Sequence, residues 1–196
     1  MTLPNNIVTV FHTVTTDLSL PLPWPRPYIP LPYHANSPIL IWGGASSCGQ
    51  YALQILTQWG YKNLLTTASP SNHVYLHSLG AKHVFDYRDP NVAKAVLNAA
   101  AVHATEPKIP FIFDCIGSKS GSLAELVKIA ENGTKVAVLL PVILKDATDK
   151  KVPEYSMDVQ SSAEWKDGVE ARGVRTHFYR EVSFFYLLLW PFFSLI

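Results

Sequence analysis

From Pro38 onward, short apolar runs alternate with longer segments in which apolar residues recur at helical spacing. The short runs predict strands at residues 39–43, 63–68, 83–87, 111–116 and 135–140. The longer segments predict helices at residues 49–59, 72–79, 91–103 and 120–131. Because each strand run is apolar on both faces, the repeated order predicts a buried parallel sheet in a doubly wound α/β fold.

The flanking segments are less regular. Prolines crowd residues 20–38 and predict a connector, because proline removes a backbone donor and favours extended neighbours. The preceding stretch "IVTVFHTVTTDL" has an ambiguous period that leaves helix and strand open. Residues 145–172 are charged and lack a clear period, which predicts a surface excursion before a further strand at residues 173–179.

The stretch "ILIWGGASSCGQYALQ" places a glycine turn between the first predicted strand and its helix. Its segment "GASSCG", residues 44–49, matches G-x-G-x-x-G with Ser46 in place of the middle glycine. Free backbone N–H groups and the helix dipole at such a turn favour an anion. Ser46 is small enough for close approach, and its hydroxyl can donate to a phosphate. We therefore expect a dinucleotide pyrophosphate here, with a plain strand-to-helix turn as the structural alternative.

Rival sites are excluded by missing residues. No Gly-Lys-Ser/Thr occurs, so the lysine that grips phosphates in a nucleoside triphosphatase P-loop is absent. No tyrosine is followed four residues later by lysine, which removes the acid/base pair of short-chain dehydrogenases. No Gly-x-Ser-x-Gly occurs, so an esterase nucleophile has no elbow.

The choice of dinucleotide depends on the end of the second strand, where a carboxylate would bind the ribose of NAD. No Asp or Glu occurs in residues 50–85, so nothing there repels the 2′-phosphate of NADP. The neutral donors in this stretch are Ser69, Ser71 and Asn72. We therefore expect NADP(H), with a preference that depends on a cationic contribution from His73 or Lys62. The structural alternative is an ordinary turn and helix N-cap.

Composition narrows the partners and the compartment. The formal net charge is +1, without a Lys/Arg stripe or tail, so we expect no nucleic acid partner. Cys48 and Cys115 are too few for a disulfide framework or a four-thiolate zinc site, and free thiols are typical of a reducing compartment. The first residues lack a signal-peptide pattern, so the sequence predicts a cytoplasmic location.

Other reactive side chains have structural interpretations. His73 and His77 lie four residues apart, as zinc ligands do on a helix, but the glutamate of H-E-x-x-H and a third ligand are missing, so we expect no metal. Asp114 and Cys115 end the fourth predicted strand, which favours a role near the cofactor. Without a basic partner, Cys115 is not predicted to be a nucleophile.

Taken together, "PILIWGGASSCGQYALQ", "TTASPSNHVYLHSLGAKHVFDYRDPNV", "FDCIGS" and "GVRTHFY" resemble the nucleotide-binding half of zinc-independent medium-chain dehydrogenases/reductases. The similarity runs from about residue 10 to residue 179 and is nearest to fungal trans-acting enoyl reductases and toxin-biosynthesis proteins. It implies a Rossmann-like domain in which residues 45–48 touch the pyrophosphate. It also implies that residues 69–72 and Tyr87 surround the 2′-phosphate, and that the backbone near Leu139 and Leu140 lies beside the nicotinamide. The expected cofactor contacts are Gly44, Ala45, Ser46, Ser47, Cys48, Gly49, Ser69, Ser71, Asn72, Tyr87, Ile116, Leu139 and Leu140.

The resemblance implies NADPH-dependent hydride transfer to an activated double bond of a small-molecule substrate, and it identifies no catalytic residue. Compared with the family, we expect its GroES-like N-terminal domain to be largely missing, so residues 1–37 are interpreted as a remnant connector and residues 38–180 as the NADP-binding domain. Residues 181–196 form an apolar tail that is too short to span a bilayer, although interfacial attachment stays open.

One alternative is a non-catalytic dinucleotide-binding or interaction module that forms a homodimer or binds a partner subunit through a sheet edge or the tail. A methyltransferase is a weaker alternative, because that fold also favours an acidic residue that binds the ribose, and residues 50–85 contain none.

Overall fold

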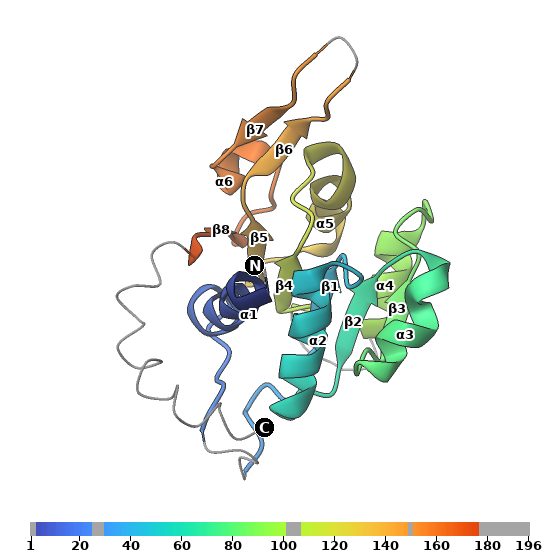
Figure 1. Cartoon of the computed structure of the whole chain (residues 1–196), viewed down its shortest axis with the longest axis vertical. Coiled ribbons are helices and arrows are strands. Elements are labelled where there is room, and N and C mark those ends of the chain that lie inside the picture. Colours follow the sequence, from blue (N-terminus) through green and yellow to red (C-terminus); the bar gives the residue numbers. More distant parts are fainter. Residues whose placement is uncertain (1–2, 25–29, 101–106, 149–150, 177–196) are drawn as a thin grey trace.

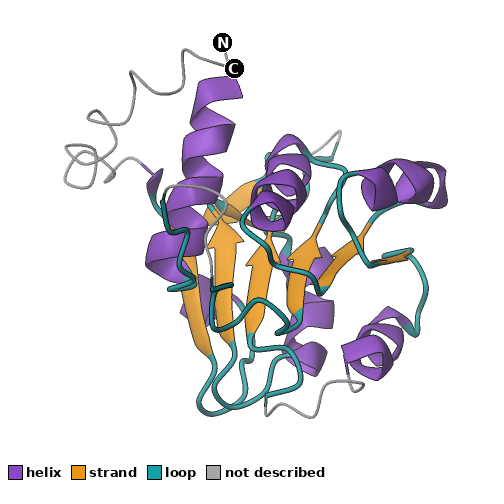
Figure 2. Ribbon diagram, turned by 90° about the horizontal axis from the view of Figure 1, so that it is seen from below, coloured by secondary structure: helices purple, strands orange, loops and turns teal. Residues whose placement is uncertain are grey.

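The computed structural model describes residues 3–24, 30–100, 107–148 and 151–176. A parallel sheet of six strands forms the middle layer, with helices on both faces (Figures 1 and 2). Its strands are β1 (Ile39–Trp42), β2 (Leu64–Thr67), β3 (His83–Phe85), β4 (Phe111–Asp114), β5 (Lys135–Leu139) and β8 (Glu170–Val174). The strand order is β3-β2-β1-β4-β5-β8. The predicted doubly wound parallel sheet is therefore confirmed.

The helices between successive strands from β1 to β5 are α2 (Ser47–Gln58), α3 (His73–Ser78), α4 (Val92–Ala100) and α5 (Ala124–Ile129). The helix α1 (Leu3–His12) precedes β1. Short helical turns precede or extend them: η1 (Thr13–Asp17), η2 (Pro70–Asn72) and η3 (Lys119–Leu123). These bounds agree with the predicted helices to within a few residues, and the last residues of the predicted helix 91–103 lie outside the described chain.

The core is split by the sheet, because successive side chains of a strand point to opposite faces. Ile39 and Ile41 of β1 pack on one face with residues of α1 and α2, such as Val10 and Leu53. The intervening side chains of β1 pack on the other face with residues of α4 and α5. Both faces of the sheet are buried, which explains why its strands are apolar throughout rather than alternating.

The N-terminal segment forms the helix α1, followed by η1. Its sequence pattern is compatible with either a helix or a strand. Val10, Val14, Leu18 and Leu20 are fully buried in the core on the α2 face. Within the described part of residues 20–38 no helix or strand forms, in agreement with the predicted connector. The division of the chain at residue 38 stays a prediction.

The C-terminal part of the described chain is more ordered than its pattern predicted. A two-stranded antiparallel sheet, β6 (Val142–Lys145) with β7 (Glu154–Ser156), forms around the start of the predicted surface excursion, and the short helix α6 (Val159–Ser162) lies within it. The last strand, β8, begins at Glu170 rather than at residue 173. The pattern missed its first residues because β8 is an edge strand on which charged side chains alternate with partly buried ones.

No helix among the described residues is long and apolar enough to cross a membrane. The apolar tail at residues 181–196 lies outside the described residues, as do residues 177–179 of the predicted last strand.

Candidate functional site

The glycine turn between β1 and α2 is held against β2. Gly43 N donates to Thr67 Oγ1 at 3.0 Å, and Gly44 N donates to Thr67 O at 2.9 Å. Thr66 Oγ1 donates across the same strand pair to Ile41 O at 2.6 Å. The sequence pattern predicts a strand at these threonines but not this role. The available signal was a polar pair at the end of an apolar run.

Packing requires glycine at two positions of the turn. A Cβ on Gly44 would lie 2.1 Å from Thr66 Oγ1, and a Cβ on Gly49 would lie 2.5 Å from Gly43 O. The second overlap is with backbone, which cannot rotate aside. Gly49 therefore allows α2 to pack closely on the turn, which is the role of the last glycine in a dinucleotide fingerprint.

Ser46, which stands where that fingerprint has its middle glycine, is the N-cap of α2. Its Oγ accepts from Gly49 N at 3.1 Å, and its hydroxyl hydrogen-bonds the Cys115 thiol. The N–H groups of Ser47 and Cys48 lie in the first turn of α2, where no carbonyl of the helix can accept from them. An anion at this turn would meet these backbone donors first.

The predicted cofactor contacts follow the carboxyl ends of adjacent parallel strands. In sheet order they are Tyr87 after β3, Ser69, Ser71 and Asn72 after β2, residues 44–49 after β1, Ile116 after β4, and Leu139 with Leu140 at β5. The chain order reverses between β1 and β4, so the glycine turn lies at a topological switch point, where ligands bind in open α/β sheets. The structure thus brings all the predicted contacts to one edge of the sheet.

The turns after β1, β4 and β5 also touch one another. A Cβ on Gly43 would lie 2.7 Å from Ile116 Cδ1, so the partly exposed Ile116 side chain lies over the glycine turn. Gly117 has a φ of 63°, and a Cβ there would lie 2.7 Å from Leu139 O. The three strand ends therefore form one continuous surface.

Beside the glycine turn, the polar loop after β2 is internally bonded. Asn72 Nδ2 donates to Ser69 Oγ at 2.9 Å, and the Ser69 and Ser71 hydroxyls are 3.4 Å apart. A bridge links this region to the turn. Tyr75 OH donates to Gln50 Oε1 at 3.1 Å, and Gln50 Nε2 donates to Ala45 O at 2.8 Å. This bridge does not follow from the sequence pattern, because its two side chains are far apart in the chain.

Lys62 and His73 were the two candidate cations for this loop, and only one of them lies near it. Lys62 precedes β2 and so lies at the opposite edge of the sheet, and its backbone N donates to Ala35 O at 2.8 Å. His73 remains close, with Nε2 3.2 Å from Ala68 O. Arg88, which was not among the predicted site residues, follows β3, the strand next to β2. Lys62 is therefore removed as a candidate.

A buried carboxyl group fixes the turn after β4. Asp114 is fully buried, its Oδ1 accepts from Ile116 N at 2.9 Å, and its Oδ2 accepts from Ser122 Oγ at 2.6 Å. Burial raises the pKa of Asp114 to about 6, against the opposing effect of these hydrogen bonds. Every described contact of this carboxyl group is within the turn and η3, so its role is to position Ile116 and Gly117.

Both thiols at the site are free and protonated. Burial raises the pKa of Cys48, and burial together with the neighbouring Cys48 and Asp114 raises that of Cys115 well above its ordinary value. A nucleophilic cysteine needs a lowered thiol pKa, so neither side chain is suited to that role.

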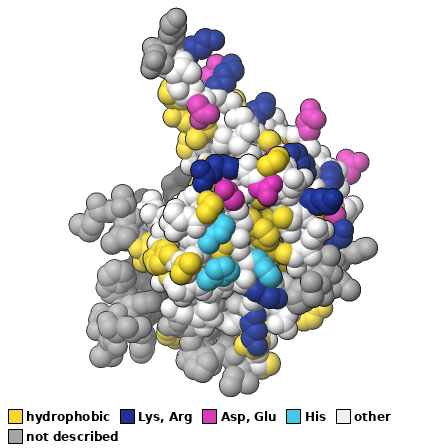
Figure 3. All heavy atoms as spheres, turned by 90° about the vertical axis from the view of Figure 1, so that its right-hand side faces the viewer, with side chains coloured by type: hydrophobic (Ala, Val, Ile, Leu, Met, Phe, Trp, Pro, Cys, Tyr) yellow, Lys and Arg dark blue, Asp and Glu magenta, His cyan; other side chains and the backbone are white. Residues whose placement is uncertain are grey.

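The described histidines make no metal centre. Histidine side chains gather on the face that carries α3, α4 and β3 (Figure 3). His77 Nδ1 lies 2.8 Å from Ala81 O, and the ring of His73 engages the backbone through Nε2. Among the described residues, no group of three or more His, Cys, Asp or Glu side chains is placed to hold a metal ion.

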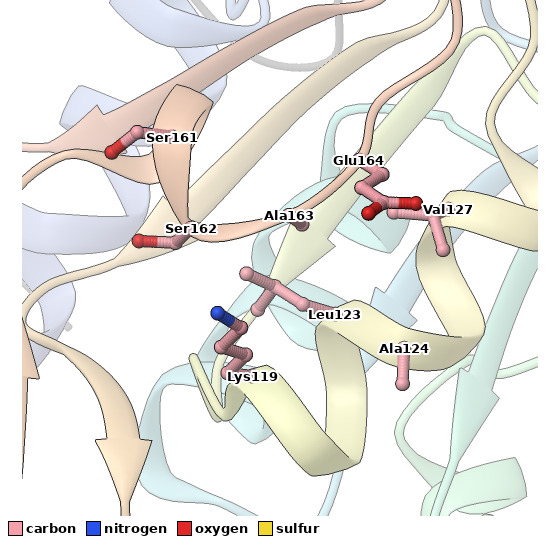
Figure 4. A pocket seen from close by; sticks show the side chains of 8 residues that line it. All are labelled: Lys119, Leu123, Ala124, Val127, Ser161, Ser162, Ala163 and Glu164. Carbon is pink, nitrogen blue, oxygen red and sulfur yellow. The ribbon is translucent and has the colours of Figure 1, made fainter.

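A groove of about 430 Å³ lies between α5 and α6 (Figure 4). It is lined by Lys119, Leu123, Ala124, Val127, Ser161, Ser162, Ala163 and Glu164. None of the predicted cofactor contacts lines it, so it is not part of the site at the carboxyl edge of the sheet.

Curated relatives are fungal. The dual trans-enoyl reductase/FAD-dependent monooxygenase tazHJ of Aspergillus terreus is 31% identical over 164 residues, which cover 84% of this chain and 22% of that protein. The trans-enoyl reductase himH of Aspergillus japonicus is 33% identical over 141 residues, which cover 71% of this chain and 38% of that protein. The chain thus spans well under half the length of these relatives. No family model matches it.

Solved structures share the fold at low sequence identity. The CurK enoyl reductase superposes with a TM-score of 0.65 at 16% identity, covering 99% of this chain and 51% of CurK. CurA of Vibrio vulnificus, solved in complex with NADPH, superposes with a TM-score of 0.59 at 10% identity and covers 91% of this chain and 48% of CurA. From these fungal relatives and this Rossmann-like sheet, we conclude that the chain belongs to the medium-chain dehydrogenase/reductase superfamily, among its enoyl reductase-like members.

Proposed function

We propose that the chain binds NADP(H) along the carboxyl edge of its sheet and serves an oxidoreductase of the enoyl or quinone reductase type. The reaction would be hydride transfer from NADPH to an activated double bond of a small molecule. The observation that carries the proposal is the turn between β1 and α2, where Gly49 permits backbone contact with Gly43 and the N–H groups of Ser47 and Cys48 have no acceptor within the helix.

The residues present fit a dinucleotide. The pyrophosphate would lie at the glycine turn and accept from the N–H groups of Ser47 and Cys48. The 2′-phosphate would lie at the loop after β2, whose hydroxyl and amide groups are uncharged donors. Residues 50–85 contain no Asp or Glu, so no carboxylate of that stretch would repel the phosphate. Ser46 would act mainly through the helix cap, because its Oγ already bonds Gly49 N.

The nicotinamide end of the cofactor would lie near the end of β5. When bound, NADPH supplies the hydride, and the protein supplies orientation. Asp114 holds the turn that carries Ile116, and Gly117 allows this turn to approach Leu139 O closely. A rigid surface of this kind fixes one face of a bound ring, which is the contribution that positioning makes to catalysis. No described side chain is assigned to proton transfer.

Two of the relatives are themselves trans-enoyl reductases by name, and these names support the enoyl assignment over other hydride acceptors. A cytoplasmic location, a stand-alone activity and a partner subunit remain expectations from the sequence. A non-catalytic dinucleotide-binding module is the second candidate, because no residue of the described chain is identified as catalytic.

The first test is a fluorescence titration of the full, folded chain with NADPH and NADH. Saturable binding with preference for NADPH supports the proposal, whereas a folded chain that binds neither dinucleotide overturns it. Consumption of NADPH that depends on an added enal or quinone then separates an enzyme from a binding module. Gly49→Ala is the matched negative control, because its Cβ would overlap the backbone of the glycine turn while no polar group is removed.

A further inference from the structure

We propose that Arg88 is the cation that binds the 2′-phosphate of NADP(H), and that Asp86 limits the strength of this contact by competing for the same guanidinium. The inference rests on the proposed cofactor site and adds to it the charge that the loop after β2 lacks. Within residues 68–75 and 86–91, which follow β2 and β3, Arg88 is the only Lys or Arg.

The sheet places Arg88 beside that loop. Thr67 and Phe85 are Cα partners in the parallel pair β2 and β3. Beyond this pair, Ala68 N donates to Phe85 O at 2.9 Å, so the chain leaving β3 runs next to the chain leaving β2. Residues 86–88 therefore border the loop that holds Ser69 and Asn72.

The guanidinium of Arg88 is held in place, but only part of its hydrogen-bonding capacity is taken up by described residues. Its Nε donates to Asp86 Oδ1 at 3.1 Å, and the same oxygen accepts from Arg88 N at 3.1 Å. The guanidinium carbon lies 5.3 Å from the centre of the Tyr87 ring. More than half of the Arg88 side chain (57%) is exposed, and Nε makes its one side-chain hydrogen bond to a described residue. The terminal N–H groups, which have the geometry for a bidentate phosphate contact, remain available.

Asp86 has opposing effects on such a contact. It aligns Arg88 through two hydrogen bonds, and its negative charge also offsets part of the positive charge that a phosphate would meet. A 2′-phosphate carries more negative charge than one carboxylate and can accept two parallel N–H bonds, so it competes effectively for an exposed arginine. Removing the Asp86 charge while keeping an oxygen at that position should therefore strengthen NADPH binding.

Substitutions of Arg88 and Asp86 should change NADPH affinity in opposite directions. Arg88→Gln should weaken NADPH binding about tenfold, the effect of losing one charge-assisted hydrogen bond, and should change NADH binding less than twofold. Asp86→Asn keeps an acceptor for Arg88 N and should tighten NADPH binding several-fold. Arg88→Lys should give an intermediate result, because lysine keeps the charge and loses the planar fork.

The experiment is a fluorescence titration of the full chain and each variant with NADPH and NADH, repeated in competition with 2′,5′-ADP and with 5′-ADP. Lys94→Gln is the matched control, because Lys94 is exposed on α4 and its loss makes the same change in net charge. Added NaCl should weaken NADPH binding more steeply in the parent chain than in Arg88→Gln. Circular dichroism checks that each variant is folded.

The outcomes separate the two proposals. A selective loss of affinity for NADPH and 2′,5′-ADP in Arg88→Gln, absent from Lys94→Gln, supports the role of Arg88. If the parent chain binds NADPH and Arg88→Gln leaves the NADPH to NADH ratio unchanged, the role of Arg88 is overturned while the cofactor site stands. If the folded parent chain binds neither dinucleotide, the proposed function fails and this inference fails with it.

Discussion

Ser122 Oγ donates to Asp114 Oδ2 at 2.6 Å, and both side chains are almost completely excluded from solvent. The same Ser122 oxygen accepts from Ser118 N at 3.0 Å, so one hydroxyl satisfies the carboxyl group at the end of β4 and the backbone that leads into η3. This hydrogen bond holds the turn after β4 in place. The turn packs against the end of β5 and forms part of the proposed cofactor surface.

Ser122→Ala should lower the free energy of unfolding by about 2 kcal/mol, because it leaves a buried carboxyl oxygen and a backbone N–H without their partner. Urea denaturation of the two proteins measures the difference. Ser78→Ala is the control, since Ser78 is exposed and donates only to Tyr75 O in its own helix. An equal effect of both substitutions would contradict the assigned importance of the Asp114 contact.

Asp17 should make the protein less stable as pH rises. Burial raises the pKa of Asp17 to about 6 against the lowering effect of Arg172, and no hydrogen-bond partner for its Oδ2 is found among the described residues. His12 Nε2 lies 3.9 Å from that oxygen. Because the folded-state pKa is the higher one, the stability contribution of Asp17 is present below about pH 4 and is lost as pH rises through about 6.

Asp17→Asn stays neutral at every pH, so it should raise the melting temperature at pH 8 more than at pH 5. Asp158→Asn is a control with the opposite sign. Hydrogen bonds from Ser161 and Gln160 lower the pKa of Asp158, so its contribution is present above about pH 4, and the Asn variant should be the less stable protein at pH 8. A pH-independent effect of Asp17→Asn would show that its carboxyl group does not titrate as described.

Gly49→Ala should destabilise the protein by about 1 to 3 kcal/mol and abolish dinucleotide binding, because its Cβ would lie 2.5 Å from Gly43 O and 2.7 Å from Gly44 Cα. Denaturation and the NADPH titration measure the two effects. Ser47→Ala in the same helical turn removes only an exposed hydroxyl and should leave stability nearly unchanged. Normal NADPH affinity in Gly49→Ala would place the cofactor elsewhere.

Ser46→Ala should lower stability by about 1 kcal/mol through loss of the α2 N-cap, and Ser46→Asn, which supplies another capping oxygen, should recover most of it. Thermal unfolding of the three proteins gives the comparison. A loss that Asn does not recover would indicate that the hydrogen bond to the Cys115 thiol, rather than the cap, is the important contact of Ser46.

The pattern of apolar and polar residues is sufficient to predict the sheet and most of its helices, because apolar runs such as residues 39–42 are buried on both faces and the intervening segments have helical spacing. It also located the glycine turn, since close packing of α2 on the turn requires glycine at position 49. These features are local, and each can be identified within a short window of the chain.

Other features depend on contacts between distant parts of the chain. The helical state of residues 3–12 depends on packing against α2, and the start of β8 depends on pairing with β5, so neither follows from its own pattern. The Gln50 bridge to Tyr75 and the approach of Arg88 to the loop after β2 join residues that only strand order brings together. Lys62 was wrongly considered for the same reason: proximity in sequence to the loop does not show which edge of the sheet a residue occupies.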